Sequence, residues 1–343
     1  MRNKGLISLL AVTLAAVAIA IYVGQSGETP QENPLVGTSV LPEVGKRIDD
    51  VGRVALVHGG VKTTLVRRGK GWVVEEKSDY PANDTKVNQA LLGLAGITYV
   101  EMKTRTPALY PRLDVEDADK KDAKSTLVTI ADAKGSLLGE LIVGKSRIDQ
   151  LGGGNDGVYV RKPGGAQSWL ARGTLDLSGD TTKWLDTSLL DLPEAKVKDV
   201  VLTQADGSKL AFKRDKPGDN FALAVPMPPG KKLKAGGPFD DPGSALAGLE
   251  LADVRPAKGF DFPKTGAAEA RYESFDGLVV TLSVVKQAGT DWARIAVTGS
   301  GAAAKQAAAL EAKVQPWIFA IADYKAKALE TKLGDVVEAA KGS

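Results

Sequence analysis

The sequence predicts an α+β protein in which one N-terminal transmembrane helix precedes two tandem, similar modules of antiparallel sheet with packed helices. Three observations carry this prediction. An uncharged apolar run occupies residues 6–23, short alternating segments separated by glycine turns begin at residue 51, and the same order of segments returns at residue 197. At 343 residues the chain is long enough for two folded units.

The composition fits a folded body and excludes several kinds of chemistry. Apolar residues make up 43% and charged residues 25% of the chain, as in ordinary globular proteins. The absence of cysteine excludes disulfides, thiolate nucleophiles and zinc–thiolate sites, and a single histidine, His58, argues against serine triads and multi-histidine metal sites. A net charge of +3 is too small to indicate a nucleic-acid surface. We therefore expect no enzyme activity, catalytic residue, cofactor, metal ligand or nucleic-acid partner.

The first predicted element is a membrane-spanning helix that starts at Leu6 and ends at Val23. At about 1.5 Å per residue this run nearly crosses a hydrocarbon core of roughly 30 Å, and it exceeds the ~7–15 apolar residues typical of a cleaved signal peptide. Arg2 and Lys4 precede it, which predicts that the rest of the chain lies outside the cytoplasm. Ala18-Ile19-Ala20 resembles a small-x-small cleavage site, so cleavage of the segment is the alternative.

The whole chain divides into four parts. Residues 1–24 form the anchor, residues 25–48 are a linker with several prolines and glycines, and residues 49–193 and 194–343 form the two modules. In the first module, a strand meander from residue 51 to 74 precedes a helix that Asn83 or Asp84 caps. The apolar stripe of this helix falls on Val87, Leu91 and Leu94.

The second half repeats this order. Val197, Val200 and Leu202 occupy the places of Val51, Val54 and Leu56. A helix is expected after Asp241 and Pro242, and further strands follow in both halves, at residues 126–130, 137–143, 157–161 and 167–170, and at residues 270–275, 278–285 and 292–297. The C-terminal part predicts helices over residues 302–322, interrupted at Pro316, and over residues 324–340.

The sequence resembles a known bacterial family, the proteins that contain a domain of unknown function designated DUF4340. The resemblance covers nearly the whole chain and rests on the N-terminal span and on residues 71–74, 81–84, 87–92, 141–145, 158–161 and 317–324. It implies a single-pass bacterial inner-membrane protein that accompanies the membrane or auxiliary subunits of an ABC-type, gliding-motility-like transport system. The family has no assigned catalytic residues, so none is transferred to this chain.

Two motifs invite a ligand, and the sequence favours a structural interpretation of both. Residues 139–146 match the letters of a phosphate-binding loop, but residues 140–143 are apolar and β-branched, and the glycines at 152–154 leave no room for the required helix. We therefore expect no nucleotide. The acidic cluster lacks the glycine and distal glutamate of a calcium loop and predicts a solvated loop; it consists of Asp114, Glu116, Asp117, Asp119 and Asp122.

For four weaker features of the sequence we also expect a structural role and no catalytic or ligand-binding role. The glycine-rich residues 152–157 predict a hairpin connection, and the basic residues 231–234 predict a solvated loop tip, with docking to anionic lipid or an acidic partner as the alternative. His58 is expected in a surface turn. The five tryptophans are expected to anchor cores; they are Trp72, Trp169, Trp184, Trp292 and Trp317.

Three hypotheses about function follow. The first is an extracytoplasmic accessory or scaffold subunit that acts by protein binding through its two modules. The second is an envelope glycan- or peptide-binding module with a ligand cleft between the modules. The third is a hydrolase that uses carboxylates alone.

Overall fold

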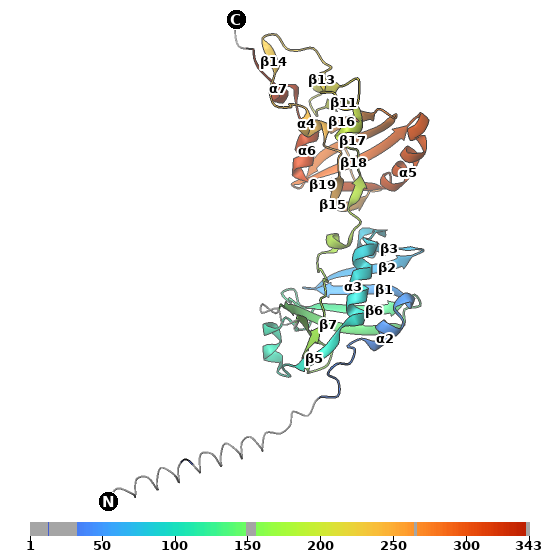
Figure 1. Ribbon diagram of the computed structural model, residues 1–343, viewed down its shortest axis with the longest axis vertical. Helices are drawn as coiled ribbons and strands as arrows, with labels where there is room; N and C mark the ends of the chain where they lie inside the picture. The colour runs from blue at the N-terminus through green and yellow to red at the C-terminus, as the bar shows by residue number, and fades with distance from the viewer. Residues whose placement is uncertain (1–12, 14–32, 149–155, 264–265, 341–343) are drawn as a thin grey trace, which may run out of the picture.

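Two nine-stranded antiparallel sheets, one after the other along the chain, form the body of the protein (Figure 1). The computed structural model describes residues 13, 33–148, 156–263 and 266–340. The α+β class predicted from the alternating segments is confirmed. Across this described part, every helix is too short or too polar to cross a bilayer, and the span predicted for residues 6–23 lies outside it apart from Thr13.

The first sheet has the strand order β4-β3-β2-β1-β6-β7-β8-β9-β5. The strands are β1 (Val51–His58), β2 (Val61–Arg68), β3 (Gly71–Val74), β4 (Tyr80–Pro81), β5 (Thr98–Met102), β6 (Thr126–Asp132), β7 (Leu137–Arg147), β8 (Gly157–Arg161) and β9 (Ser168–Arg172). Three short 3-10 helices accompany them, η1 (Ile48–Asp50), η2 (Glu75–Lys77) and η3 (Pro107–Arg112). β5 reaches the far edge of the sheet because the chain crosses one face through a helix before it.

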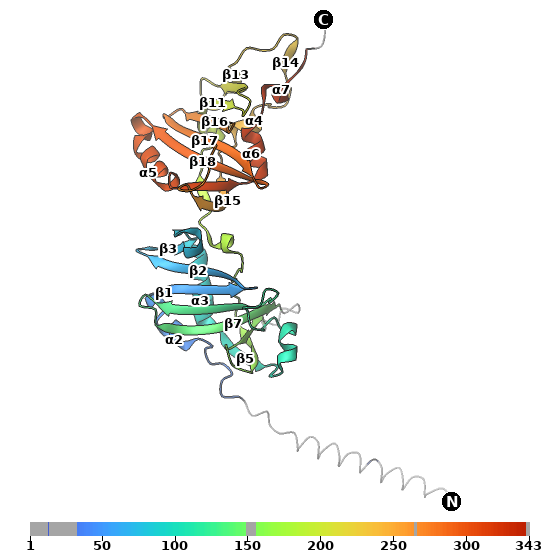
Figure 2. The same ribbon diagram turned by 180° about the vertical axis from the view of Figure 1, so that it is seen from behind.

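That helix is α3 (Asp84–Gly96), which begins where the sequence predicted. The side chain of Asn83 accepts a hydrogen bond from the Lys86 amide at 3.0 Å, which satisfies one free donor of the first turn. Val87, Leu91 and Leu94 are buried against the sheet. In Figure 1 α3 passes in front of the strands, and in Figure 2 the strands β1, β2, β6 and β7 present the opposite face.

The folded part begins earlier than residue 49, the predicted start of the first module. α2 (Pro42–Lys46) packs on the first sheet, and Val40, Leu41 and Val44 are buried within it. Gly139 permits this approach, because a Cβ atom at that position would lie only 2.9 Å from Leu41 Cδ2. Residues 33–48 therefore belong to the first module, since three apolar side chains there are removed from water.

The second sheet has the order β10-β15-β19-β18-β17-β16-β11-β12-β13. Its strands are β10 (Ser188–Leu190), β11 (Val197–Thr203), β12 (Lys209–Lys213), β13 (Ala222–Leu223), β15 (Leu249–Pro256), β16 (Ala268–Ser274), β17 (Leu278–Gln287), β18 (Thr290–Gly299) and β19 (Trp317–Ile321). The helices around it are η5 (Glu194–Lys196), α4 (Asp240–Gly243), η6 (Gly301–Ala303), α5 (Ala304–Val314), α6 (Asp323–Leu329) and α7 (Leu333–Val336). The preceding helix, η4 (Thr181–Trp184), packs on the first module, where Thr181 Oγ1 lies 2.6 Å from Thr63 Oγ1. β14 (Lys231–Leu233) and β20 (Val337–Ala339) form a separate two-stranded sheet.

The helices predicted for the second half of the chain are wrong in three places. The predicted helix over residues 302–322 ends at Val314, and β19 follows Pro316 and pairs with β15 and β18. The stretch 324–340 contains two short helices and then β20. The helix after Asp241 ends at Gly243, and residues 249–256 form β15 instead. Pairing with neighbouring strands determines these segments, and helical periodicity does not register such long-range partners.

The two sheets share one topology. Read from β13, the second sheet follows the order in which the first is read from β3, with β15 and β5 in the same place near the far edge. A bulge interrupts the pairing of β1 with β6 between Val51 and Arg53, and a bulge interrupts that of β11 with β16 between Val197 and Asp199. Register positions therefore correspond between the sheets.

Two arginine–aromatic stacks also recur at corresponding register positions. The guanidinium of Arg67 lies 5.2 Å from the Trp72 ring, and that of Arg214 lies 4.0 Å from the Phe221 ring. A second pair repeats in the same way, Arg161 over Tyr110 at 4.5 Å and Arg294 over Phe262 at 4.6 Å. Arg67 and Trp72 are directly opposite each other in β2 and β3, whereas Phe221, Tyr110 and Phe262 lie outside the strands, so the other three stacks hold connecting segments against their sheets.

The two sheets meet at an aromatic contact. Tyr80 at the end of the first sheet is buried, and its ring packs edge-on against Trp317 and Phe319 of β19, with centroids 5.0 and 6.4 Å away. Lys77 reaches Asp253 across the junction at 2.5 Å. β10 lies before residue 194, the predicted start of the second module, and yet pairs with β15 of the second sheet.

Candidate functional site

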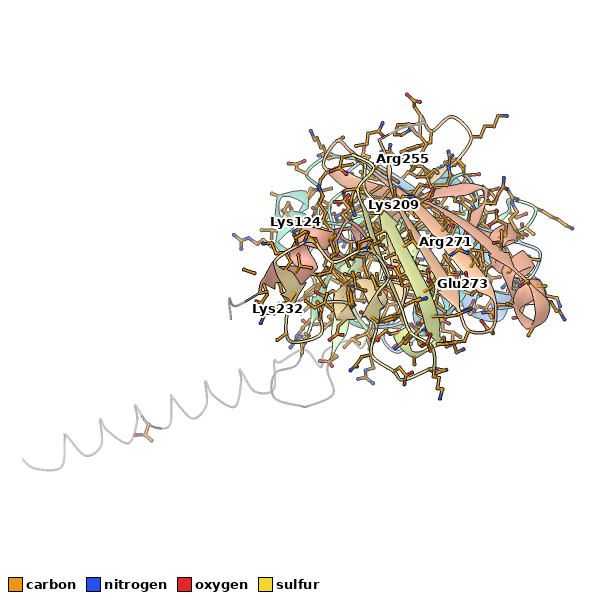
Figure 3. All side chains as sticks on the ribbon, turned by 90° about the horizontal axis from the view of Figure 1, so that it is seen from above. Lys124, Lys209, Lys232, Arg255, Arg271 and Glu273 are labelled. Atoms are coloured by element: carbon orange, nitrogen blue, oxygen red, sulfur yellow. The ribbon has the colours of Figure 1, made fainter. Side chains whose placement is uncertain are left out.

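The described helices leave the outward face of the second sheet uncovered over β12, β11, β16 and β17 (Figure 2). Residues alternate along these strands between a buried inner set and a partly exposed outer set. We call the outer set the open face; its members are Lys209, Ala211, Lys213, Asp199, Val201, Thr203, Glu269, Arg271, Glu273, Val279, Thr281 and Ser283. Figure 3 looks down on the molecule and labels Lys209, Arg271 and Glu273.

Val201 and Ala211 are two adjacent apolar side chains in the middle row of the open face, and charged side chains lie in the same row and in the rows beside it. Val201 pairs with Ala211 on one side and Arg271 on the other, and Arg271 pairs with Thr281 of β17. One row further along, Asp199 lies between Lys213 and Glu273. The charged side chains of the two outer rows form a rim beside this small apolar spot, and a polar, charged rim is typical of protein interfaces.

Two carboxylates lie directly opposite each other in this rim. Asp199 of β11 pairs with Glu273 of β16, an arrangement of like charges that is unfavourable across a sheet. Partial burial, with the charge of Glu273 as the second cause, raises the pKa of Asp199 above its usual range. Arg271 lies 2.9 Å from Glu273 and Lys198 lies 3.9 Å away, so cations offset part of the repulsion. A basic group of a partner could neutralise the rest.

This pair predicts a pH dependence. A carboxyl group whose pKa is raised in the folded state contributes stability below its unfolded pKa of about 3.9 and loses it as the pH rises through the folded pKa. Asp199→Asn should therefore gain stability relative to the wild type as the pH rises through this acidic range, and urea unfolding at several pH values measures it. Glu273→Gln should lower the pKa of Asp199 in an NMR titration, and an unchanged pKa would contradict the assigned cause.

Aromatic side chains cover the same face of the sheet over β18 and β19. Trp292 of β18 and Ile318 of β19 are buried there, and Phe260 and Phe262 pack against them from the loop after β15. Arg255 stacks on the Trp292 ring at 4.3 Å. The open face is therefore limited to the β12 to β17 part of the sheet.

The letters of a phosphate-binding loop fall inside a strand, as the sequence indicated. β7 contains all of residues 139–146, and Lys145 and Ser146 are exposed on it. A Cβ atom at Gly144 would lie 2.2 Å from the carbonyl oxygen of Leu113 and 2.6 Å from that of Asp114. Gly144 is therefore required by the close approach of the backbone at residues 113–114.

The acidic loop is organised by a buried arginine. Arg161 is 4% exposed; its Nη2 lies 2.5 Å from Asp117 and its Nε donates to the carbonyl oxygen of Val115 at 2.8 Å. Glu116 accepts a hydrogen bond from the Lys124 amide at 2.7 Å. A search of the described residues finds no group of three or more histidine or acidic side chains placed to hold a metal ion.

The basic segment, His58 and the tryptophans all contact other parts of the fold. Residues 231–233 are not a free tip but form β14, where Lys232 lies 3.2 Å from Glu338 of β20. His58 ends β1, its Nδ1 lies 3.0 Å from the Ser125 carbonyl, and its ring fills the space beside Gly179. Trp72, Trp169, Trp184 and Trp292 are buried, and Trp317 lies partly buried at the junction. The glycines at 152–154 lie outside the described residues.

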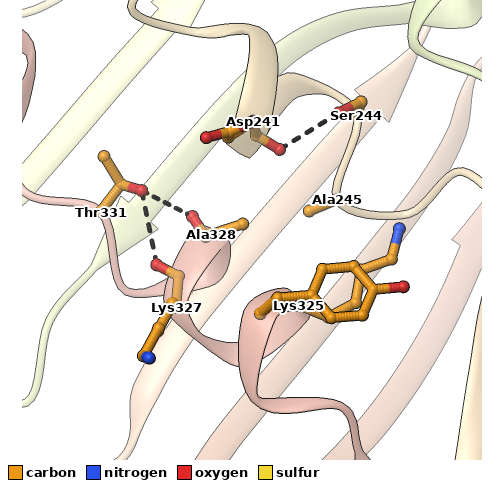
Figure 4. Close-up of a pocket in the computed structure, with 8 residues that line it drawn as sticks. Asp241, Ser244, Ala245, Lys325, Lys327, Ala328 and Thr331 are labelled. Atoms are coloured by element: carbon orange, nitrogen blue, oxygen red, sulfur yellow. Dashed lines mark hydrogen bonds between the residues drawn. The ribbon is translucent and has the colours of Figure 1, made fainter.

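Two hollows in the second module have polar walls. A hollow of about 400 Å³ lies between α4 and α6 (Figure 4). Lys325 there donates to the Ala247 carbonyl at 2.7 Å, and burial lowers its pKa. Ser244 and Thr331 donate to carbonyls of the same helices. A second hollow of about 590 Å³ lies beside Arg214, whose Nε donates to the Val197 carbonyl at 2.8 Å. These polar groups hold the surrounding segments together.

Sequence comparison gives one family and no characterised relative. A family model described as "Domain of unknown function (DUF4340)" matches residues 72–270, which is more than half of the 343 residues. The match runs from β3 of the first sheet to β16 of the second and includes the junction. No curated protein and no solved structure matches the chain significantly.

Proposed function

Because the chain belongs to the DUF4340 family, we propose that it is a membrane-anchored, extracytoplasmic accessory subunit that acts by protein binding. Residues 6–23 would form the anchor in the bacterial inner membrane, and the two similar modules would extend from it. The partners would be membrane or auxiliary subunits of an ABC-type, gliding-motility-like transport system. The open face is the observation that supports binding, since the described helices leave it uncovered and its acidic and basic side chains suit a protein partner of complementary charge.

The topological correspondence of the two sheets supports the tandem architecture. One family model runs from β3 of the first sheet to β16 of the second and includes the junction, which supports treating the two joined sheets as one unit. Tyr80 and the Lys77–Asp253 ion pair fix this unit into an elongated body. Such a body suits a scaffold, because a surface fixed relative to the anchor can present a partner at a defined height.

Charge reversal on the open face should abolish partner binding. We expect the double variant Lys213→Glu, Arg271→Glu to lose co-purification with a transport subunit from detergent-solubilised membranes, because like charges at an interface rim oppose association. The matched control reverses two exposed lysines away from this face, Lys134→Glu in the first module and Lys305→Glu in α5, and should retain the partner. Equal recovery with both double variants would exclude the open face as the binding surface.

The anchor is tested in the same experiment. A chain without residues 1–24 should no longer co-sediment with membranes, yet should still bind a solubilised partner through the open face. If the intact and the truncated chains behave alike and neither retains a membrane partner, the accessory-subunit proposal fails.

The alternative, a glycan- or peptide-binding module, places its ligand between the modules. The Tyr80 contact with Trp317 and Phe319 occupies part of that region, and the hollows beside Arg214 and Lys325 lie within the second module. Saturable thermal stabilisation by envelope glycans or peptides would favour this alternative over protein binding.

A further inference from the structure

A turn of the chain covers the outer edge of β5. The Gly37 amide donates to the Tyr99 carbonyl at 2.8 Å, and the Tyr99 amide donates to the Thr38 carbonyl at 3.0 Å. The turn itself closes through the Val36 amide, which donates to the Asn33 carbonyl at 2.8 Å. Residues 33–37 are thereby fixed at the edge of the first sheet, and β5 lies at the end of the molecule opposite to β14 and α7 (Figure 1).

Three large apolar side chains are exposed together at this edge. Leu35 is 45%, Val36 is 46% and Met102 is 48% exposed. The Asn33 side-chain amide lies 3.2 Å from the Met102 sulfur, which places the turn beside the end of β5. We call this group the β5 pole. Exposed apolar side chains that gather at one place mark an interaction site more often than single ones do.

Basic residues follow the β5 pole along the chain. Arg105 and Arg112 are exposed in the segment that leaves β5, and Lys103 pairs with Glu101 at 2.6 Å. Apolar side chains flanked by arginines suit the boundary of a bilayer, where the former enter the interface and the latter meet lipid phosphates.

The short segment between the predicted anchor and Asn33 limits how far the β5 pole can lie from the membrane. The segment between Val23 and Asn33 extends by at most about 35 Å, at ~3.5 Å per residue. If residues 6–23 cross the bilayer, the β5 pole is the part of the body that this short segment holds nearest to the lipid.

We propose that the β5 pole rests on the membrane surface, with Leu35, Val36 and Met102 in the lipid interface and Arg105 beside the headgroups. This inference depends on the anchor in the proposed function. Docking at the pole would orient the long axis of the body away from the membrane and raise the open face of the second sheet toward a partner. The occupant is the bilayer and not a second protein.

The cysteine-free sequence permits a direct test with single labelled cysteines in the full chain. An environment-sensitive fluorophore is attached at Val36→Cys, and the protein is reconstituted into phosphatidylcholine vesicles that contain phosphatidylglycerol and a lipid with a shallow spin label. We expect blue-shifted emission and quenching at this position. Adding Leu35→Ser and Met102→Ser should abolish the quenching, since both side chains are exposed and their replacement leaves the core intact.

Two further labels separate the possible failures. A label at Met227→Cys, in the exposed loop before β14 at the opposite end, should not be quenched. A label at Ala16→Cys should be quenched by a deep spin label if residues 6–23 span the bilayer. Quenching at Ala16 with none at Val36 beyond that at Met227 would overturn membrane docking and leave the anchor standing. Absence of quenching at Ala16 would overturn the anchor, and the docking proposal with it.

Discussion

Tyr80→Ala is expected to lower the free energy of unfolding by about 3–5 kcal/mol, the range for truncating a large buried aromatic side chain. The ring is 1% exposed and packs edge-on against Trp317 at 5.0 Å. Its loss would leave a cavity at the point where the two sheets meet. We therefore expect the sheets to unfold less cooperatively and to sample a wider range of relative orientations.

Urea unfolding measures the first effect, and small-angle X-ray scattering measures the second. Tyr80→Phe is the matched control, because it keeps the ring and removes only the hydrogen bond from the hydroxyl to the Asp186 carbonyl at 3.3 Å, at a cost of about 1 kcal/mol. Tyr324→Ala, at a residue 69% exposed, should change stability by less than about 0.5 kcal/mol. A scattering profile of Tyr80→Ala identical to that of the wild type would show that other contacts fix the junction.

Gly144→Ala should destabilise the first module by about 1–3 kcal/mol or more, the usual cost of overpacking. The new Cβ atom would lie 2.2 Å from the Leu113 carbonyl oxygen, and because this is a backbone atom, the whole acidic loop would have to shift. Gly96→Ala is the control, since no other atom lies within 4 Å of its Cβ position. Thermal unfolding of the two variants gives the comparison.

The neighbouring lysine separates this structural role from a phosphate-binding one. Lys145 is exposed in β7, so Lys145→Ala should change stability by less than about 0.5 kcal/mol. A phosphate-binding loop would give a different result, namely ATP-dependent stabilisation of the wild type that Lys145→Ala abolishes. If that stabilisation were observed, residues 139–146 would bind phosphate, and their purely structural role as part of β7 would be wrong.

The sequence predicted elements whose determinants are local. Asn83 caps α3 and the stripe of Val87, Leu91 and Leu94 faces the sheet, because a cap and a helical period lie within a few residues of each other. The alternating strands of both halves and the glycine turns between them were recognised for the same reason. The family was identified from such short segments, and its model matches residues 72–270.

Segments that depend on distant partners were not predicted. β19 follows a helix and a proline, and it becomes a strand because β15 and β18 lie on either side of it. β5 and β15, which lie after helices, were missed as well. Residues 39–46 were assigned to the linker because their few apolar side chains show no period, and only the sheet surface beneath them explains their burial.

The open face also combines features that local sequence patterns predict with features that depend on distant partners. Alternation along β11 and β16 indicated which side chains point outward, but the sequence does not contain the register that places Asp199 opposite Glu273, more than 70 residues later. Local residue patterns and the composition of the sequence therefore determined the α+β class, the repeated order of strands and the exclusion of thiol chemistry. Only the tertiary structure decided which strands form the sheet edges, which aromatic side chains form the junction and which charged residues pair. Each of these features joins residues that are distant in the chain and come into contact only when the sheets form.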